Sequence, residues 1–239
     1  MYTKVASAIS RVDAGTPPSV DLSLAGKIRT AILGGDLAPH QRLIEVDLCE
    51  QYAANRGAVR TALQELAADG LVELMRHKGA KVRSVSLAEA IEITEVRMML
   101  EGLAAAKAAE HVTDAEADYL QHLGLQMRAA VDQSDFERYS ELNVTLHATV
   151  RRIARHRTSE QIIDRLGYQV VRYQYRLSRR PGRPSVSLPQ HERIITAIVA
   201  HDSAGAMSAM QQHLRSVRDA LMQAGDENHP DGGRGTPPQ

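Results

Sequence analysis

Three histidines in the C-terminal half of the chain have the residue type and the surroundings of metal ligands. His147 follows Asn143 by one helical turn, and His191 and His213 each lie beside the apolar stripe of a different predicted helix. Three helices therefore direct an imidazole toward one interior, which is how helical bundles assemble metal sites. Buried, hydrogen-bonded histidines would produce the same pattern, so the spacing alone leaves a structural role open beside a metal site.

Arginine is concentrated just after this point in the chain. Ten arginines lie between Arg151 and Arg183, against only two acidic residues. Guanidinium groups bind carboxylates through paired hydrogen bonds, so Arg172 and Arg176 are candidates for holding an anion in a cavity. A solvated helix face would have the same composition. Arg97 has two interpretations as well, because it can pair with Glu101 one turn away or face inward.

A second group of polar side chains, in the N-terminal third, suits DNA recognition. Arg56, Arg60 and Gln64 are spaced by four on one face of a predicted helix whose opposite face is apolar. In a major groove, arginine pairs with guanine and glutamine with adenine. Lys78 and Gly79 lie at the tip of a predicted hairpin, where the glycine permits close approach of the backbone. An ordinary solvated helix face remains the alternative explanation for these charges.

The elements that must position these residues form two groups. Apolar spacing, a cap at Asn55 and breaks at Gly34-Gly35 and Asp69-Gly70 predict three short helices, followed by two extended runs. This order predicts a winged helix-turn-helix over residues 21–85. The first expected helix carries Leu24, Ile28 and Ile32 and stops at Gly34-Gly35. The other expected helices and extended runs are 46–52, 56–68, 71–75 and 80–85.

From Ser86 onward every signal is helical. Four capping boxes, at Ser86/Glu89, Thr113/Glu116, Ser134/Glu137 and Thr158/Gln161, mark helix starts, and Pro189 lies near a fifth. Six helices of this length predict an antiparallel bundle over residues 86–224, so the chain as a whole is mainly α. Residues 1–20 and 225–239 are polar or rich in Gly and Pro, and we expect a flexible leader and a disordered tail. The six expected spans are 86–110, 114–132, 134–156, 158–180, 188–201 and 203–224.

Composition excludes several classes of protein. Lysine plus arginine equals aspartate plus glutamate, at 29 each, so the whole chain is not a polybasic nucleic-acid binder. No apolar run approaches the roughly 20 residues of a membrane span, and we find no secretory signal. A single cysteine, Cys49, excludes internal disulfides and multi-cysteine zinc fingers. We expect a cytoplasmic protein with no membrane partner.

The N-terminal segment has Leu37-Ala38-Pro39, Val59-Arg60 and Gly70-Leu71-Val72 among many residues at fixed spacings. On these residues it resembles the DNA-binding domain of the GntR family of bacterial transcription regulators. The resemblance implies that Arg56, Arg60 and Gln64 contact operator DNA and that Gly79 lies at the wing tip near the minor groove. The family often has Ser-Arg-Thr-Pro where this chain has Asn55-Arg56-Gly57-Ala58, a difference that alters base preference rather than abolishing binding. The matching residues, over about 55 positions, are Ile28, Ile32, Gly35, Leu37-Ala38-Pro39, Arg42-Leu43, Glu45, Leu48, Val59-Arg60, Ala62-Leu63, Leu66 and Gly70-Leu71-Val72.

The remainder of the chain, from Ser86 to about Gln223, is similar to the FCD ligand-sensing domain of the FadR-type branch of that family. Six helices resemble its VanR-like subgroup. The resemblance implies a divalent ion bound by Asn143, His147, His191 and His213, and domains that bind small carboxylates and pair as homodimers. We expect zinc, with nickel or manganese as alternatives. The matching motifs are Val96-Arg97-x-x-x-Glu101, Asn143-x-x-x-His147, His191-Glu192-x-Ile194 and Met210-x-x-His213-Leu214.

Together these observations predict a dimeric repressor that binds double-stranded operator DNA and is released by a small carboxylate at a metal site. Arg97, Arg172 and Arg176 are the expected effector-binding residues. The alternative is a small metalloenzyme with an N-terminal assembly domain, since three histidines with an open coordination position also occur in zinc hydrolases. We see no general base for that role, because Glu192 points a different way around its helix. A regulator with a purely structural bundle is a third possibility.

Overall fold

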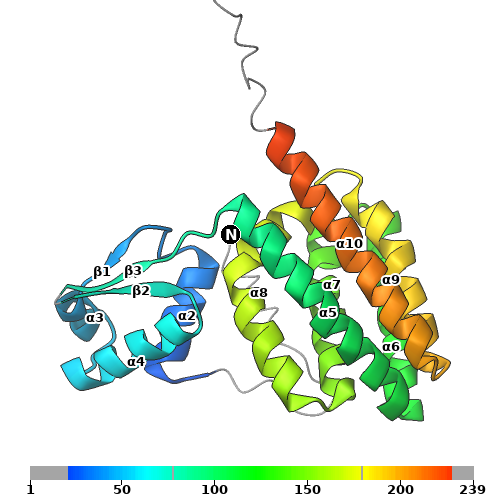
Figure 1. Cartoon of the computed structure of the whole chain (residues 1–239), viewed down its shortest axis with the longest axis horizontal. Coiled ribbons are helices and arrows are strands. Elements are labelled where there is room, and N and C mark those ends of the chain that lie inside the picture. Colours follow the sequence, from blue (N-terminus) through cyan, green and yellow to red (C-terminus); the bar gives the residue numbers. More distant parts are fainter. Residues whose placement is uncertain (1–20, 77, 179, 228–239) are drawn as a thin grey trace, which may run out of the picture.

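The computed structural model describes residues 21–76, 78–178 and 180–227, which form a small N-terminal domain beside a larger helical domain (Figure 1). The chain is mainly α, as predicted. No helix in these ranges combines the length and hydropathy needed to cross a membrane. The elements are α2 (Leu24–Gly34), β1 (Arg42–Leu43), α3 (Glu45–Gln51), α4 (Arg56–Ala68), β2 (Val72–Met75), β3 (Gly79–Val82), α5 (Leu87–His111), α6 (Asp114–Asp132), α7 (Phe136–Ala154), α8 (Arg157–Ser178), α9 (Arg183–Val199) and α10 (Ser203–Glu227).

The N-terminal domain packs α2, α3 and α4 against a three-stranded antiparallel sheet in the order β1-β3-β2. The hairpin of β2 and β3 was predicted, whereas β1 was not, because two residues are too few to show an alternating pattern. Gly79 has a φ of +81°, and a Cβ at this position would lie 2.2 Å from the carbonyl oxygen of Leu43. The glycine is therefore required where β3 passes β1.

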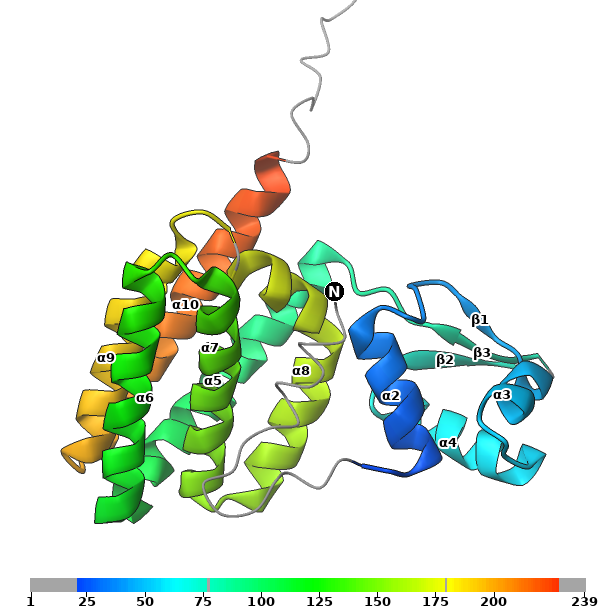
Figure 2. The ribbon, with the colours of Figure 1, turned by 180° about the vertical axis from the view of Figure 1, so that it is seen from behind.

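The helical domain is built on α5, whose alanines allow its neighbours to approach closely. Four of them, Ala104, Ala105, Ala108 and Ala109, are buried in the main core with residues of α6, α7, α9 and α10. The view from behind shows α6 and α9 on the side of the bundle away from the N-terminal domain (Figure 2). In that view the C-terminal end of α10 extends beyond the other helices.

Most helix starts follow their predicted caps. Ser86 accepts from the backbone N–H of Glu89, and Thr113 and Glu116 form a complete capping box. Two predicted caps are wrong. Asp135, and not Ser134, caps α7, because Ser134 has a φ of 56° and ends the preceding turn. At the start of α8, the N–H of Ser159 donates to Nδ1 of His156, so His156 and not Thr158 supplies the cap.

Two helix boundaries also differ from expectation. Helix α9 begins at Arg183, five residues before the predicted start at 188. Proline is favoured in a first turn because its missing N–H is not needed there, and Pro184 rather than Pro189 occupies that position. Helix α10 continues to Glu227, so residues 225–227 of the predicted tail are helical. The predicted leader, residues 1–20, and residues 228–239 lie outside the described residues.

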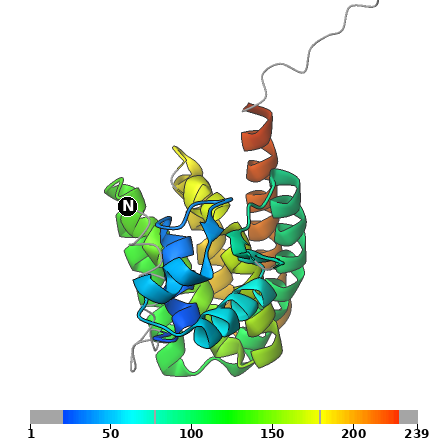
Figure 3. The same cartoon turned by 90° about the vertical axis from the view of Figure 1, so that its left-hand side faces the viewer.

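Helix α8 joins the two domains. Val171 of α8 is part of the apolar core of the N-terminal domain, and Tyr168 packs against the same cluster. The view onto the N-terminal domain shows it lying directly in front of the bundle (Figure 3). The two domains therefore share a core through this helix.

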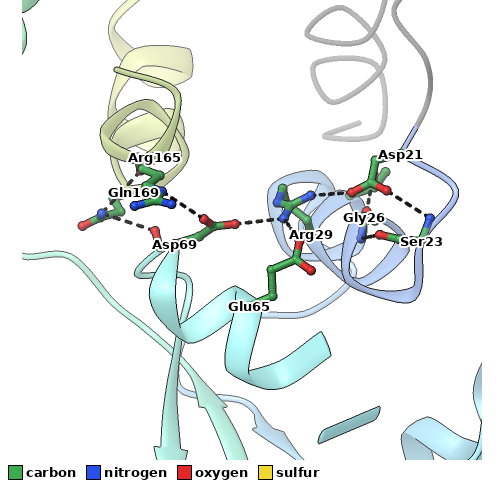
Figure 4. A network of polar contacts seen from close by, with 9 residues as sticks. Asp21, Ser23, Gly26, Arg29, Glu65, Asp69, Arg165 and Gln169 are labelled. Atoms are coloured by element: carbon green, nitrogen blue, oxygen red, sulfur yellow. Dashed lines mark hydrogen bonds and ion pairs between the residues drawn. The ribbon is translucent and has the colours of Figure 1, made fainter. Parts of the chain in front are cut away.

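A polar network surrounds that apolar contact (Figure 4). Arg29 of α2 pairs with Asp69 at 2.9 Å, and Arg165 of α8 approaches the same carboxylate at 3.6 Å. The Nε2 of Gln169 donates to the backbone carbonyl of Asp69 at 3.3 Å. The end of α4 is thus held both by its own domain and by α8.

Candidate metal-binding cavity

Three helices bring three imidazoles together in the core of the helical domain. His147 lies on α7, His191 on α9 and His213 on α10, and all three are buried. One ring nitrogen of each lies within 4.8 Å of the corresponding nitrogens of the others. The ring centroids of His191 and His213 are 4.3 Å apart. Each histidine reaches this point because it occupies the inward stripe of its helix, next to core residues such as Leu146, Ile194 and Met210.

Each imidazole is oriented by a partner on its Nδ1 atom. When Nδ1–H donates to an oxygen, the Nε2 lone pair remains available for an ion, which is the usual arrangement of histidine ligands. The partners come from α5, α7 and α9, so the packing of the bundle determines the orientation of all three rings. The pairs are His147–Glu101 at 2.7 Å, His191–Tyr139 at 3.0 Å and His213–Gln190 at 3.0 Å.

The charge state of the cluster suits a cation. Burial, with a smaller effect of His147, lowers the pKa of His191 well below the usual histidine value. The pKa of His213 is lowered in the same way, first by burial and then by His191. Both rings are therefore neutral near pH 7, and their Nε2 atoms are 3.3 Å apart.

An unpartnered oxygen lies in the cavity that the histidines also line. The Oδ1 atom of Asn143, one turn before His147, is buried and has no hydrogen-bond partner among the described residues. Three imidazole nitrogens and one amide oxygen fit a divalent first-row ion, for which imidazole and carbonyl groups are established ligands. The set contributes no negative charge of its own.

A buried ion pair supports the cluster from α5. Arg97 Nη2 donates to Glu101 at 2.5 Å, and Glu101 also accepts from His147. Burial alone would raise the pKa of Glu101, but the opposing effects of Arg97 and His147 are larger and hold that pKa well below its usual range. The two interpretations of Arg97 therefore hold together, since it pairs with Glu101 and also lines the cavity.

The cluster opens into a cavity of about 140 Å³. Its walls come from α5, α7, α8, α9 and α10 and combine apolar side chains with a few polar ones. Arg183, in the first turn of α9, donates from Nη1 to the carbonyl and hydroxyl oxygens of Ser216, at 3.2 and 2.9 Å. The lining includes Arg97, Asn143, Val144, Arg151, Ile163, Asp164, Tyr168, Val171, Gln174, Leu177, Arg183, Leu214 and Val217.

Arg172 and Arg176 are not in this cavity, contrary to expectation. They lie on the neighbouring face of α8, where they line a hollow between the two domains. Arg172 donates to the backbone carbonyls of Ile32 and Leu37 of the N-terminal domain, both at 3.2 Å. Two other arginines of the same segment, Arg151 and Arg183, line the cavity instead.

The predicted DNA-binding side chains form an exposed row on the other domain. Arg56, Arg60 and Gln64 are all exposed along α4, whose Asn55 cap accepts from the N–H of Ala58. The guanidinium of Arg60 pairs with Glu45 of α3 at 3.0 Å. This exposed ion pair orients the side chain without burying it.

Two family models together account for most of the chain. Residues 22–82 match the bacterial regulatory proteins of the gntR family, and residues 92–216 match the FCD domain. The chain belongs to the GntR family. It is a transcriptional regulator of the GntR/FCD type, a family that binds operator DNA and senses small molecules through the FCD domain. Since members of this family are regulators, the metalloenzyme alternative is set aside.

Curated relatives of this GntR regulator extend over most of its length. The repressor RspR of Escherichia coli strain K12 is 27% identical over 192 residues, covering 80% of this chain and 84% of that protein. The repressor GlaR of the same strain is 28% identical over 206 residues, covering 82% and 93%. The gluconate operon repressor of Bacillus subtilis is 24% identical, covering 85% of each.

Solved structures show the same fold. Escherichia coli McbR/YncC superposes with a TM-score of 0.69 at 21% identity, covering 86% of this chain and 98% of that chain. A GntR regulator from Rhodococcus sp. RHA1 has a TM-score of 0.65 at 19% identity, covering 84% and 96%. These likenesses extend through both domains of the regulator.

Several residues of the site were not identified from the sequence of the regulator. Tyr139 and Gln190 orient two of the histidines, yet neither lies in a recognisable motif. Glu101 was noted only as a partner of Arg97, and its bond to His147 depends on the crossing of α5 and α7. Glu192 pairs with Arg128 on α6, away from the histidines, which agrees with the prediction that it points elsewhere.

Proposed function

We propose that this regulator is a homodimeric repressor whose operator is released when a small carboxylate binds beside a divalent ion in the FCD domain. The observation that carries the proposal is the convergence of three Nδ1-supported histidines and an unpartnered amide oxygen in one cavity. That cavity shares a wall, α8, with the DNA-binding domain.

Asn143, His147, His191 and His213 would hold the ion. Zinc is the first choice, with nickel or manganese as alternatives, because imidazole nitrogens suit all three metals. A bound ion would supply positive charge and open coordination positions for a carboxylate oxygen. The oxygens of Glu101, Tyr139 and Gln190 hold the three imidazole rings in their orientations, while the apolar wall limits access of water.

The DNA-binding end of the proposal rests on α4 and the β2–β3 hairpin. Arg56, Arg60 and Gln64 would reach base edges or phosphates, and Lys78 and Gly79 would approach the backbone at the wing. A two-fold operator is read by two such helices about one DNA turn apart, which requires a dimer. A small change in the position of the N-terminal domains would therefore alter operator affinity.

Helix α8 is the proposed route between the two ends. One face lines the cavity with Gly167, Val171 and Gln174. On the neighbouring face, Arg172 donates to backbone carbonyls of α2 and of the turn that follows it. The Tyr173 hydroxyl donates to the carbonyl of Val85, in the segment between the domains, at 3.0 Å. An effector that moves α8 must therefore move contacts of the DNA-binding domain. The repressor names of RspR, GlaR and the gluconate regulator support release as the sign of the response.

The test is operator binding followed by fluorescence anisotropy, using DNA that flanks the regulator's own gene. Metal-loaded protein should bind, and a panel of carboxylates should include one that releases it. His213→Ala should keep operator binding and lose the response, with His201→Ala at an exposed helix end as the control. A His213→Ala protein that folds, binds operator and still responds fully would remove the metal from the mechanism.

A further inference from the structure

Arg183 is a buried cation for which the described part of the chain provides no counterion. The residue is 9% exposed, and among the described residues its hydrogen bonds go only to the neutral oxygens of Ser216. Its Nη2 atom is buried and finds no hydrogen-bond partner within the residues that the structure describes. No carboxylate among the described residues lies within ion-pair distance of it. A buried charge left in this state is costly unless an anion pairs with it.

The other cations of the cavity are already neutralised. Arg97 is paired with Glu101, and Arg151 with Asp164 at 3.3 Å. The histidines and Asn143 supply no negative charge, so a divalent ion would keep both of its positive charges. Arg183 then adds a third positive charge. A single carboxylate would leave most of this total positive charge uncompensated.

The size and walls of the cavity limit what can supply the missing charge. About 140 Å³ is close to the volume of cavities that admit benzene, so the occupant has roughly six to ten heavy atoms. Apolar side chains such as Val144, Ile163 and Leu177 line it beside the charged groups. These walls match a short hydrocarbon chain better than a polyhydroxylated one.

We propose that Arg183 forms an anion subsite of its own and that the effector is a compact dicarboxylate of about three to five carbons. One carboxylate would occupy the histidine cluster, and the other would take bidentate hydrogen bonds from Arg183. The assignment of the first carboxylate to the histidine cluster rests on the proposed function. The Arg183 subsite does not depend on a bound metal ion.

Matched ligands and a matched variant test this proposal by isothermal titration calorimetry. Succinate and butyrate share a four-carbon chain and differ by one carboxylate, so their affinities isolate the second charge. Succinate should bind metal-loaded wild-type protein at least about tenfold more tightly, the size of one charge-assisted contact. Arg183→Met should abolish most of that preference. Arg193→Met, at an exposed position of the same helix, should leave it unchanged.

The stability of the ligand-free protein gives a second readout. Since Arg183→Met removes an uncompensated buried charge, it should raise the Tm of ligand-free protein and reduce the further rise produced by succinate. A lowered Tm together with an unchanged preference would make Arg183 a structural tie to Ser216 and overturn the proposal. If Arg183→Met does not fold, Arg183→Lys keeps the charge and should retain part of the preference.

Other outcomes separate this inference from the regulator's proposed function. Equal loss of succinate and butyrate binding in Arg183→Met would overturn the assignment of a dianion. Failure of wild-type protein to bind succinate or its three- and five-carbon homologues would do the same, while operator binding would remain intact. Tight succinate binding without release of operator would overturn the proposed function and leave the subsite standing.

Discussion

The buried pair of Arg97 and Glu101 offers a quantitative test of how the cavity is built. Glu101→Gln preserves shape but removes the negative charge from a residue that is only 1% exposed. Arg97, 5% exposed, then becomes an unpaired buried cation beside His147. Breaking a buried pair by removing one partner costs about 3–5 kcal/mol. The expected fall in Tm is roughly 6–20 °C, at about 2–4 °C per kcal/mol for a protein of this size.

The same substitution should weaken metal binding. In Glu101→Gln the partner of His147 Nδ1 is no longer an anion, and loss of such supporting groups typically costs about 10–100-fold in metal affinity. Thermal unfolding of metal-free protein and zinc titration of the same preparation measure the two effects separately. Glu110→Gln is the control, because it breaks an exposed pair with Lys107 on the same helix and should change neither quantity.

The result that would refute this reasoning is a Glu101→Gln protein whose Tm and zinc affinity both match wild type. It would mean that Arg97 is not dependent on Glu101 for its counterion. The double variant Arg97→Met/Glu101→Leu provides a further check. Removing both charges should restore most of the lost stability, since apolar replacement of a buried pair is often neutral or favourable. The zinc affinity should stay low in that variant, because His147 still lacks its acceptor.

The other predictions concern acid stability, DNA, metal content and coupling. Because the folded pKa of Glu101 lies below its ordinary value of 4.5, its stabilisation is present above that pH and is lost as pH falls toward the folded value; the Tm gap between wild type and Glu101→Gln should therefore persist from pH 5 to 7 and narrow in stronger acid. Arg60→Ala should weaken specific operator binding by about 5–150-fold, and unchanged affinity and base preference in a binding titration would contradict the placement of α4. Lys78→Ala should weaken specific and non-specific binding alike and reduce the slope of log K against log salt by about one, measured between 50 and 200 mM salt. Elemental analysis of untagged protein should find about one metal per chain in wild type and less in His213→Ala. Arg172→Met should leave effector binding intact in calorimetry but reduce the release of operator, and full release would exclude this contact from the coupling.

Local signals were sufficient to predict the DNA-binding domain and most of the bundle. Side chains at Ser86, Thr113 and Asn55 bond backbone groups three residues away, so the sequence contains both partners of each cap. The predicted start of α9 was wrong because Pro184 and Pro189 both suit the first turn of a helix. The choice between them depends on the path of the chain after α8, which the local sequence does not show.

The site was predicted where it depends on helix periodicity and missed where it depends on helix crossings. The histidines lie on apolar stripes, so their convergence follows from the packing of those stripes. Arg183 could not be distinguished among ten arginines. The sequence does not show that its Nη2 atom is buried without a hydrogen-bond partner among the described residues. Arg172 was assigned to the wrong side of α8, since one residue corresponds to about 100° of rotation on a helix.

The shared position of α8 also explains how weak contacts can give a regulated response. Tyr168 and Val171 line the cavity and at the same time pack on the N-terminal core, so a ligand in the cavity would contact side chains that also hold the DNA-binding domain. The interdomain hydrogen bonds of Arg172 and Tyr173 contribute about 0.5–1.5 kcal/mol each. Allosteric coupling energies are typically about 1–3 kcal/mol, which is the same range. An effector that binds two repacked states of α8 with unequal affinity could therefore exchange this small set of contacts without unfolding either domain. In the proposed homodimer, this exchange would change the spacing of the two recognition helices and with it the affinity for the operator.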